Sequence, residues 1–237
     1  MIAPSRVDWD PSFFRKSALF WPIAPAACVL EEFTDWPTTE RLNWAFAGTA
    51  AVRFEPPTPK PRRGKAPADA RYDARIALEG RVPTRARSWH DLLNALVWAT
   101  FPSAKRALHA RQHRIIATRL GADLRLPGER TKEQDAIAML DEGGVAVLRA
   151  KDTMRAMIFG HGIYESLVCG LDPNVPFMRA AAYVIEVDAI DDDAQAQLAH
   201  ADRALAELLA RDEEIRREDF TSVNVDPKRD RIGRTRD

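Results

Sequence analysis

Apolar residues recur at helical spacing along much of the chain, most clearly after Ser88. Leu92 and Leu96 belong to an apolar stripe of the kind that faces a core. The Ser88 hydroxyl can cap the free amides of a first turn, and Asp91 stands three residues on, near the positive end of the helix dipole. Pro102 disfavours helical angles at the residue before it. The pattern therefore predicts a helix between Ser88 and Pro102.

The same reasoning predicts further helices and a few strands. Helices are expected at residues 11–20, 26–33, 38–46, 103–120, 131–142, 152–159, 161–169 and 191–210. The helix after Thr131 has a capping-box match, Thr-x-x-Gln, and ends at Gly143-Gly144. Short strands are expected at 51–54, 72–79 and 145–148, and residues 180–187 suit a strand or a buried helix. The expected fold class is α+β and mainly α, with seven to nine helices and a small β element.

Two segments lack an apolar period. Residues 56–71 are rich in proline and basic residues, which predicts a mobile extended loop. Residues 220–237 alternate in charge, which predicts a flexible tail. The domain organisation expected is therefore a single globular domain over residues 1–219, followed by a flexible charged C-terminal tail.

Composition narrows the class of protein. The hydrophobic fraction of 46% is that of a globular protein. No apolar run approaches the roughly 18–20 residues that a membrane span needs, so no membrane partner is expected. The first ten residues contain no apolar stretch typical of a secretory signal. The two cysteines, Cys28 and Cys169, argue against a disulfide framework and for a reducing compartment. We therefore expect a cytoplasmic protein.

Charge is balanced overall but unevenly distributed. Residues 60–119 carry 14 Lys/Arg and four acidic residues, whereas residues 186–219 carry 12 acidic residues and four arginines. One interpretation is that the acidic segment folds against the basic one. The other is that residues 60–119 bind nucleic acid or another phosphate ligand. The zero net charge favours the first interpretation, because it gives no long-range attraction to a polyanion.

Histidines and carboxylates near three helix ends form the candidate site. His161 and Glu165 are four residues apart, and Gly160 and Gly162 flank the histidine, which indicates close approach of another backbone or a ligand. Two histidines with several carboxylates suit a divalent metal and an activated water. The predicted catalytic residues are His90, Asp135, His161 and Glu165. The predicted metal ligands are Asp91, Asp141 and Glu142.

A structural explanation of the same residues stays open. Asp91 can be a helix cap, and His161 can be satisfied by Glu165 in tight helix packing. A second histidine pair, His109 and His113, also has helical i,i+4 spacing. Ala110 stands where a zinc-protease helix carries its glutamate, and Arg106 repels a cation, so this pair indicates a solvated face.

Three blocks of the chain resemble a known family. They are Thr84–Pro102, with Ser-Trp-His-Asp-Leu-Leu-Asn-Ala-Leu-Val-Trp; Gln134–Val145, with Asp-Ala-Ile-Ala-Met-Leu-Asp-Glu-Gly-Gly-Val; and Phe159–Leu167. Together they resemble the bacterial family catalogued as domain of unknown function 3025. The resemblance implies a bacterial cytosolic protein and no established chemistry.

The sequence thus leaves three classes of function open. The first is an enzyme, a metal-assisted hydrolase whose cofactor is a divalent metal. The second is binding of nucleic acid or phosphate through residues 60–119, and the third is a structural or protein-interaction role. The distances among the side chains of His90, Asp135, Glu142, His161 and Glu165 discriminate between the first and the third.

Overall fold

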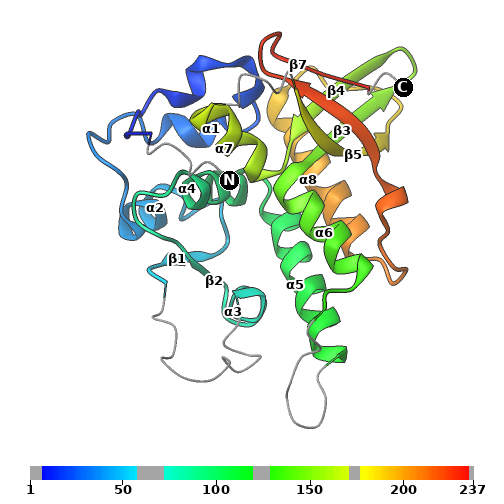
Figure 1. Cartoon of the computed structure of the whole chain (residues 1–237). Helices are drawn as coiled ribbons and strands as arrows, with labels where there is room; N and C mark the ends of the chain where they lie inside the picture. Colours follow the sequence, from blue (N-terminus) through cyan, green and yellow to red (C-terminus); the bar gives the residue numbers. More distant parts are fainter. Residues whose placement is uncertain (1–6, 58–71, 120–128, 171–176, 235–237) are drawn as a thin grey trace.

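The computed structural model of the chain describes residues 7–57, 72–119, 129–170 and 177–234. Within these residues the fold is mixed α/β, with eight α-helices, a five-stranded sheet and a separate two-stranded sheet (Figure 1). The mixed class is as predicted, but the β element is not small.

The N-terminal part consists of short elements. They are η1 (Phe13–Lys16), η2 (Ala18–Phe20), α1 (Ala24–Cys28), α2 (Thr39–Ala45), β1 (Arg53–Glu55), α3 (Tyr72–Glu79) and β2 (Arg81–Pro83). Strands β1 and β2 pair in parallel. Tryptophans tie this part to the rest of the chain: Trp9 stacks on Trp89 with ring centroids 5.6 Å apart, and the Trp89 indole donates to the carbonyl of Val7.

Three longer helices follow, and their ends agree with the sequence signals. They are α4 (Trp89–Thr100), α5 (Pro102–Thr118) and α6 (Lys132–Gly143). The Ser88 hydroxyl accepts from the amide of Asp91 at the start of α4. Thr131 and Gln134 form the predicted capping box at the start of α6. Local hydrogen bonds of this kind are why these boundaries can be predicted from sequence.

The remaining elements build the main sheet and two further helices. They are β3 (Gly144–Ala150), β4 (Thr153–Ile158), α7 (His161–Cys169), β5 (Met178–Glu186), α8 (Ala194–Ala210), η4 (Arg217–Asp219), β6 (Thr221–Asp226) and β7 (Arg231–Arg234). The strand order is β4-β3-β5-β6-β7. Only the β3–β5 pair is parallel, and the other three pairs are antiparallel.

Helices α5, α6 and α8 lie together beside the sheet, whereas α4 and α7 lie toward the N-terminal part (Figure 1). Helix α8 packs along α5, and the Asp202 carboxylate on α8 accepts from the amides of Ser103 and Ala104 at the start of α5. The acidic segment therefore packs on the basic one, in agreement with the first interpretation of the charge distribution.

The prediction of a strand at residues 72–79 is wrong, because these residues form α3. The sequence Tyr-Asp-Ala-Arg-Ile-Ala-Leu-Glu contains two alanines, arginine, leucine and glutamate, all strong helix formers. Ala74 and Ile76 are buried, and α3 packs against α5. The alternation of apolar and polar residues over these eight positions therefore predicted the conformation less well than their helix propensity.

The prediction of a helix at residues 152–159 is also wrong. Residues 153–158 form β4, which pairs with β3 in a tight hairpin. Lys151 in the turn has a positive φ of 22°. Met157 and Ile158 are buried, whereas Met154 is 64% exposed. Pairing with β3 sets the conformation here, and such a partner is not visible in a local window.

The prediction of a flexible tail at residues 220–237 is wrong for the described part of that segment. β6 pairs with β5, and β7 pairs with β6. Val223 and Val225 are buried on the same face of β6, so the segment does have the period-two pattern of a strand. The predicted proline-rich loop at residues 56–71 lies outside the described residues from residue 58 onward.

Among the described helices, none combines the length and the apolar character that crossing a membrane requires.

Candidate metal centre

Two histidines from different helices face each other. His90 lies in the first turn of α4, and His161 is the first residue of α7. Their Nε2 atoms are 3.1 Å apart, and the ring centroids are 4.5 Å apart with an angle of 74° between the planes. The two helices pack on each other. Their contact brings together His90 and His161, which are 71 residues apart in the chain.

A carboxylate from a third helix completes the group. Oε2 of Glu142, in the last turn of α6, lies 3.5 Å from Nε2 of His161. One ligand atom each from His90, Glu142 and His161 can be chosen such that all lie within 4.8 Å of one another. His161 is buried, His90 is partly buried, and the Glu142 side chain is 55% exposed. The group is therefore anchored in the interior and opens to solvent at Glu142.

Glycines allow the start of α7 to approach the end of α6. A Cβ atom at Gly162 would lie 2.8 Å from Oε2 of Glu142 and 2.9 Å from its carbonyl oxygen. A Cβ atom at Gly160 would lie 2.4 Å from the amide nitrogen of Gly144. The amides of Phe159 and Gly160 both donate to the carbonyl of Gly144, at 2.9 Å. The predicted close approach at Gly160 and Gly162 is thus confirmed.

A carboxylate lies behind each imidazole. Oε2 of Glu165 is 2.8 Å from Nδ1 of His90. Oδ1 of Asp141 is 3.9 Å from Nδ1 of His161 and accepts from the Lys105 ammonium at 2.5 Å. The Lys105 side chain has no exposed surface. Each ring therefore points Nε2 at the other ring and Nδ1 toward a carboxylate.

Negative charge at both Nδ1 atoms decides where the imidazole protons lie. A proton on Nδ1 meets a carboxylate, whereas a lone pair there would be repelled by it. With both rings neutral and both protons on Nδ1, two Nε2 lone pairs face each other across 3.1 Å. That arrangement needs a cation between or beside them, whereas a proton on Nε2 of His161 makes a neutral hydrogen bond to Nε2 of His90. The space between the rings therefore holds either this hydrogen-bond proton or a metal ion.

Burial and neighbouring charges shift the pKa values of the group in different directions. Burial lowers the pKa of His161 to about 4, against the attraction of Asp141. The hydrogen bond to Glu165 raises the pKa of His90. Burial raises the pKa of Glu142. Burial alone would raise the pKa of Asp141 as well, but the Lys105 charge and the nearby imidazoles outweigh it and lower that pKa. His161 is thus neutral at pH 7, the form that binds metals.

The separations fit a metal ion. Two histidine nitrogens that each bind zinc at about 2.0–2.1 Å, at near-tetrahedral angles, lie roughly 3.1–3.4 Å apart. The observed Nε2 separation of 3.1 Å is in that range. The 3.5 Å between His161 Nε2 and Glu142 Oε2 is close to what a shared zinc ion imposes on a nitrogen and an oxygen ligand. Two of the three ligand separations therefore match a shared zinc ion, and the third pair, His90 and Glu142, lies within 4.8 Å.

The structure brings five of the seven predicted site residues together. His90, His161 and Glu165 are in the group, as are Asp141 and Glu142. Asp91 lies beside it but pairs with Arg85, with Nη2 and Oδ1 2.7 Å apart. Asp135 is exposed in the first turn of α6, seven residues and roughly 10 Å along the helix from Glu142. The structure brings neither Asp91 nor Asp135 into contact with the two imidazoles.

One residue of the group was missed by the sequence analysis. Lys105 lies on the buried face of α5, three residues before Leu108 and next to Ala104. A lysine amid an apolar stripe was the available signal. The other histidine pair of α5 lies outside the group, and the predicted solvated face is wrong for His109, which is 2% exposed. Nδ1 of His109 is 2.9 Å from Oδ1 of Asp73, and its ring stacks on Trp98.

The cavity beside α4 is not part of the site. A cavity of about 540 Å³ is lined by Ser88 and Leu92 of this helix region, together with Arg85 and Trp36. Ser88 and Leu92 are four residues apart and share a helix face, whereas His90, midway between them, projects from the opposite face. Helix α4 therefore separates this cavity from the two imidazoles.

Comparison with known proteins finds a match to one family model over part of the chain, and that family has no described chemistry. Residues 62–157 match the family model described as "Protein of unknown function (DUF3025)", which confirms the resemblance seen in the sequence. The matched segment includes His90, Lys105, Asp141 and Glu142 and ends before α7. No curated protein and no solved structure matches the chain.

Proposed function

Because the matching family has no assigned activity, we propose a function from the site itself: this chain binds one divalent transition-metal ion and uses it to activate water for hydrolysis. The metal ligands are Nε2 of His90, Nε2 of His161 and a carboxylate oxygen of Glu142. Two histidines and one carboxylate form a ligand set that is common in catalytic zinc sites.

The facing Nε2 atoms carry this proposal. Glu165 behind His90 and Asp141 behind His161 favour protons on both Nδ1 atoms, so both lone pairs converge on one point. Carboxylates placed behind metal-binding histidines in this way fix the ring orientation and raise ligand basicity.

The open side of the group suits catalysis. Three protein ligands leave at least one tetrahedral position for water, and zinc lowers the pKa of such a water to about 7. Glu142 is the most exposed of the three ligands, so the vacant position lies toward solvent. Substrates of this chemistry are carbonyl or phosphoryl electrophiles such as esters, amides and phosphoesters.

Nucleic-acid binding through residues 60–119 is the weaker alternative. Several basic side chains of that region are used in ion pairs inside the described structure. The pairs are Arg75 with Glu55, Arg85 with Asp91, Arg87 with Asp35, Lys105 with Asp141 and Arg111 with Glu133. A cation already paired within the chain neutralises little phosphate charge.

The test is metal binding by the full chain. After treatment with a chelator, titration with Zn²⁺ or Co²⁺ followed by calorimetry should give one site per chain. His90→Ala, His161→Ala and Glu142→Ala should each weaken binding by more than about 100-fold, since each removes a ligand. Asp135→Ala is the matched control, because it removes an exposed carboxylate of the same helix as Glu142.

Hydrolysis is tested on the reconstituted protein with chromogenic esters and phosphoesters. Turnover should require the metal and disappear in His161→Ala. A purified chain that takes up no stoichiometric metal, or ligand variants with unchanged affinity, would overturn the metal site. Metal binding without turnover of any substrate would leave a metal site and refute the hydrolase.

A further inference from the structure

We propose that Asp141 and Lys105 are positioning residues for His161: Asp141 holds the proton of His161 on Nδ1, and the buried Lys105 ammonium holds Asp141 in place. This inference rests on the proposed metal site for its purpose. It extends that site beyond its ligands, to an α5 residue that does not touch the metal position.

The burial of Lys105 needs an explanation. Its side chain has no exposed surface, and its ammonium lies 2.5 Å from Oδ1 of Asp141 and 5.6 Å from the ring centroid of Trp98. Moving a charge from water into a protein interior costs several kcal/mol unless it is paired well. Apolar residues of similar size would bind α5 to α6 as firmly. The Lys105–Asp141 pair also lies next to a third polar group, on which its charges act.

That third polar group is His161. Its Nδ1 is buried, its imidazole is within reach of the backbone of Asp141, and Oδ1 of Asp141 is 3.9 Å from Nδ1. At 3.9 Å the carboxylate acts on the ring through its charge, since the distance exceeds a hydrogen bond by roughly 1 Å. Asp141 is on the Nδ1 side of the ring, opposite the metal position at Nε2, and cannot act as a ligand from there. Its role is thus to orient His161 and keep its Nε2 lone pair free.

Lys105 makes this role possible. Its ammonium, on the buried face of α5, donates to Oδ1 of Asp141 at 2.5 Å and so fixes the position of the carboxylate behind His161. This contact occupies only part of the acceptor capacity of the carboxylate, since a carboxylate offers about four lone-pair sites.

The first test uses the metal-free full chain and needs no metal binding. Long-range ¹H–¹⁵N spectra report the tautomer of each imidazole, and the chain has five histidines. The His161 signals are assigned by their loss in His161→Ala. The wild type should show the proton of His161 on Nδ1. The double variant Lys105→Met/Asp141→Leu, which replaces both charges with apolar groups, should shift the proton to Nε2 or to a mixture.

The second test measures Zn²⁺ affinity. The double variant should bind Zn²⁺ 10- to 100-fold more weakly, the usual effect of losing a partner behind a metal-binding histidine. Asp141→Asn, which keeps the volume and an acceptor, should lose less. Lys105→Arg, which keeps a cation at this position in the wild-type chain, should retain most of the Zn²⁺ affinity and the Co²⁺ visible spectrum of the wild type.

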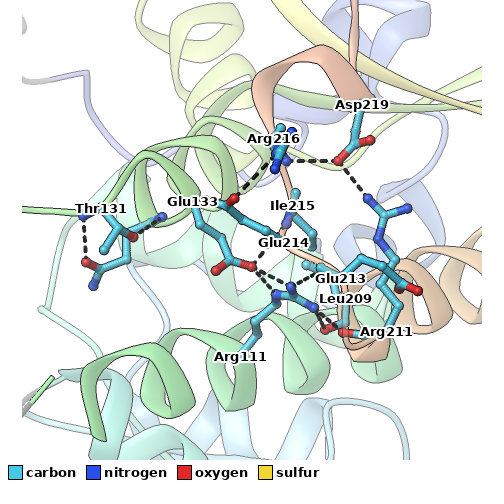
Figure 2. Close-up of polar contacts among 11 residues, drawn as sticks. Arg111, Thr131, Glu133, Leu209, Arg211, Glu213, Glu214, Ile215, Arg216 and Asp219 are labelled. Carbon is cyan, nitrogen blue, oxygen red and sulfur yellow. Dashed lines mark hydrogen bonds and ion pairs between the residues drawn. The ribbon is translucent and has the colours of Figure 1, made fainter. Parts of the chain in front are cut away.

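A matched control is Arg111→Met/Glu133→Leu. This pair also joins α5 to α6 through a buried cation and a carboxylate (Figure 2), but it lies six residues further along α5, roughly 9 Å from Lys105. It should leave the His161 tautomer and the Zn²⁺ affinity unchanged, even though it destabilises the fold.

The outcomes separate this inference from the proposed function. An unchanged His161 tautomer in the double variant and in Asp141→Asn overturns the positioning role, whether or not metal binds. If the double variant fails to fold, Asp141→Asn decides by the same readout. A tautomer that shifts as expected in a chain that binds no metal supports the positioning role and refutes the metal site.

Discussion

Two buried ion pairs join α5 to α6, and they differ in what surrounds them. Lys105 pairs with Asp141 near the metal centre, and Arg111 pairs with Glu133 nearer the other end of the helices. Both cations are almost fully buried, with side-chain exposures of 0% and 4%. Both pairs place a buried cation of α5 against a carboxylate of α6, but one cation is an ammonium and the other a planar guanidinium.

The Arg111 pair is saturated. Its guanidinium donates to Glu133 and to the backbone carbonyls of Leu209, Arg211 and Glu213, and Glu133 also accepts from the amide of Ile215 (Figure 2). The planar group with five donors thus fastens the end of α8 and the segment after it. The Lys105 pair instead leaves Asp141 next to the buried Nδ1 of His161. An ion pair whose donors and acceptors are all hydrogen-bonded can only stabilise the fold. An ion pair whose carboxylate has free acceptor sites can also act on a neighbouring side chain.

The largest expected loss of stability follows from removing the ion pair between Arg111 and Glu133. Arg111→Met/Glu133→Leu removes both charges but leaves three carbonyls and one amide without their partners. Unfolding in urea should show a loss of about 3–5 kcal/mol, since each unpaired buried polar group costs about 1–3 kcal/mol. A loss below about 1 kcal/mol would mean that water replaces these contacts and that the pair is not a fastening point.

Metal should stabilise the chain through the group beside Lys105. At a free Zn²⁺ concentration of 100 times the dissociation constant, the free energy of unfolding should rise by about 2.7 kcal/mol. The same rise is expected in Arg111→Met/Glu133→Leu, measured from its lower starting point. His161→Ala should show no rise, and a rise in that variant would place the metal elsewhere.

Acid should weaken the metal-free chain through His161. Its pKa of about 4 in the folded chain is below the 6.5 of an unfolded histidine, so the unfolded chain binds more protons between these values. Stability is therefore lost as pH falls from about 6.5 to 4, by about 2.5 kcal/mol. The raised pKa of His90 acts in the opposite direction, favouring the folded chain below pH 6.5.

The contribution of His161 is isolated by comparison with His161→Gln in the presence of a chelator. The difference in the free energy of unfolding between the two chains should change over pH 4–6.5 and stay flat below pH 4. Parallel curves would show that His161 is not buried in its neutral form.

The smallest expected effect is on stability in Lys105→Met/Asp141→Leu. Replacing a buried ion pair with apolar residues of similar volume is often neutral or stabilising. We expect a change within about 1 kcal/mol in thermal or urea unfolding, together with the weaker Zn²⁺ binding described above. A large loss of stability would make this pair equivalent to the Arg111 pair and remove the contrast between them.

Local signals account for the parts of this molecule that the sequence predicts. Ser88 and Thr131 mark the helix starts through hydrogen bonds within one turn. The glycines around His161 indicate a close approach, and the structure contains it. These features can be predicted because the residues that determine each one lie within a few positions of it in the sequence.

The parts that the sequence does not predict depend on distant partners. β4 is a strand because β3 lies beside it, and β6 because β5 does. The position of Lys105 in an apolar stripe does not identify its partner, because Asp141, which accepts its hydrogen bond, is 36 residues away. His90 and Glu165 are 75 residues apart, so their contact in the site depended on a tertiary arrangement that helical spacing cannot supply.

The crossing of α6 and α7 has a consequence for how the protein tolerates change. A methyl group at Gly160 would meet main-chain atoms of residues 142–144, 2.5 Å from the nitrogen of Gly143 and 2.6 Å from the carbonyl carbon of Glu142. Main-chain atoms cannot rotate out of the way as a flexible side chain can. Even Gly160→Ala would therefore force α6 and α7 apart and increase the distance between His161 and Glu142. The spacing of the two ligands is therefore set by bare main chain, at a residue that coordinates nothing.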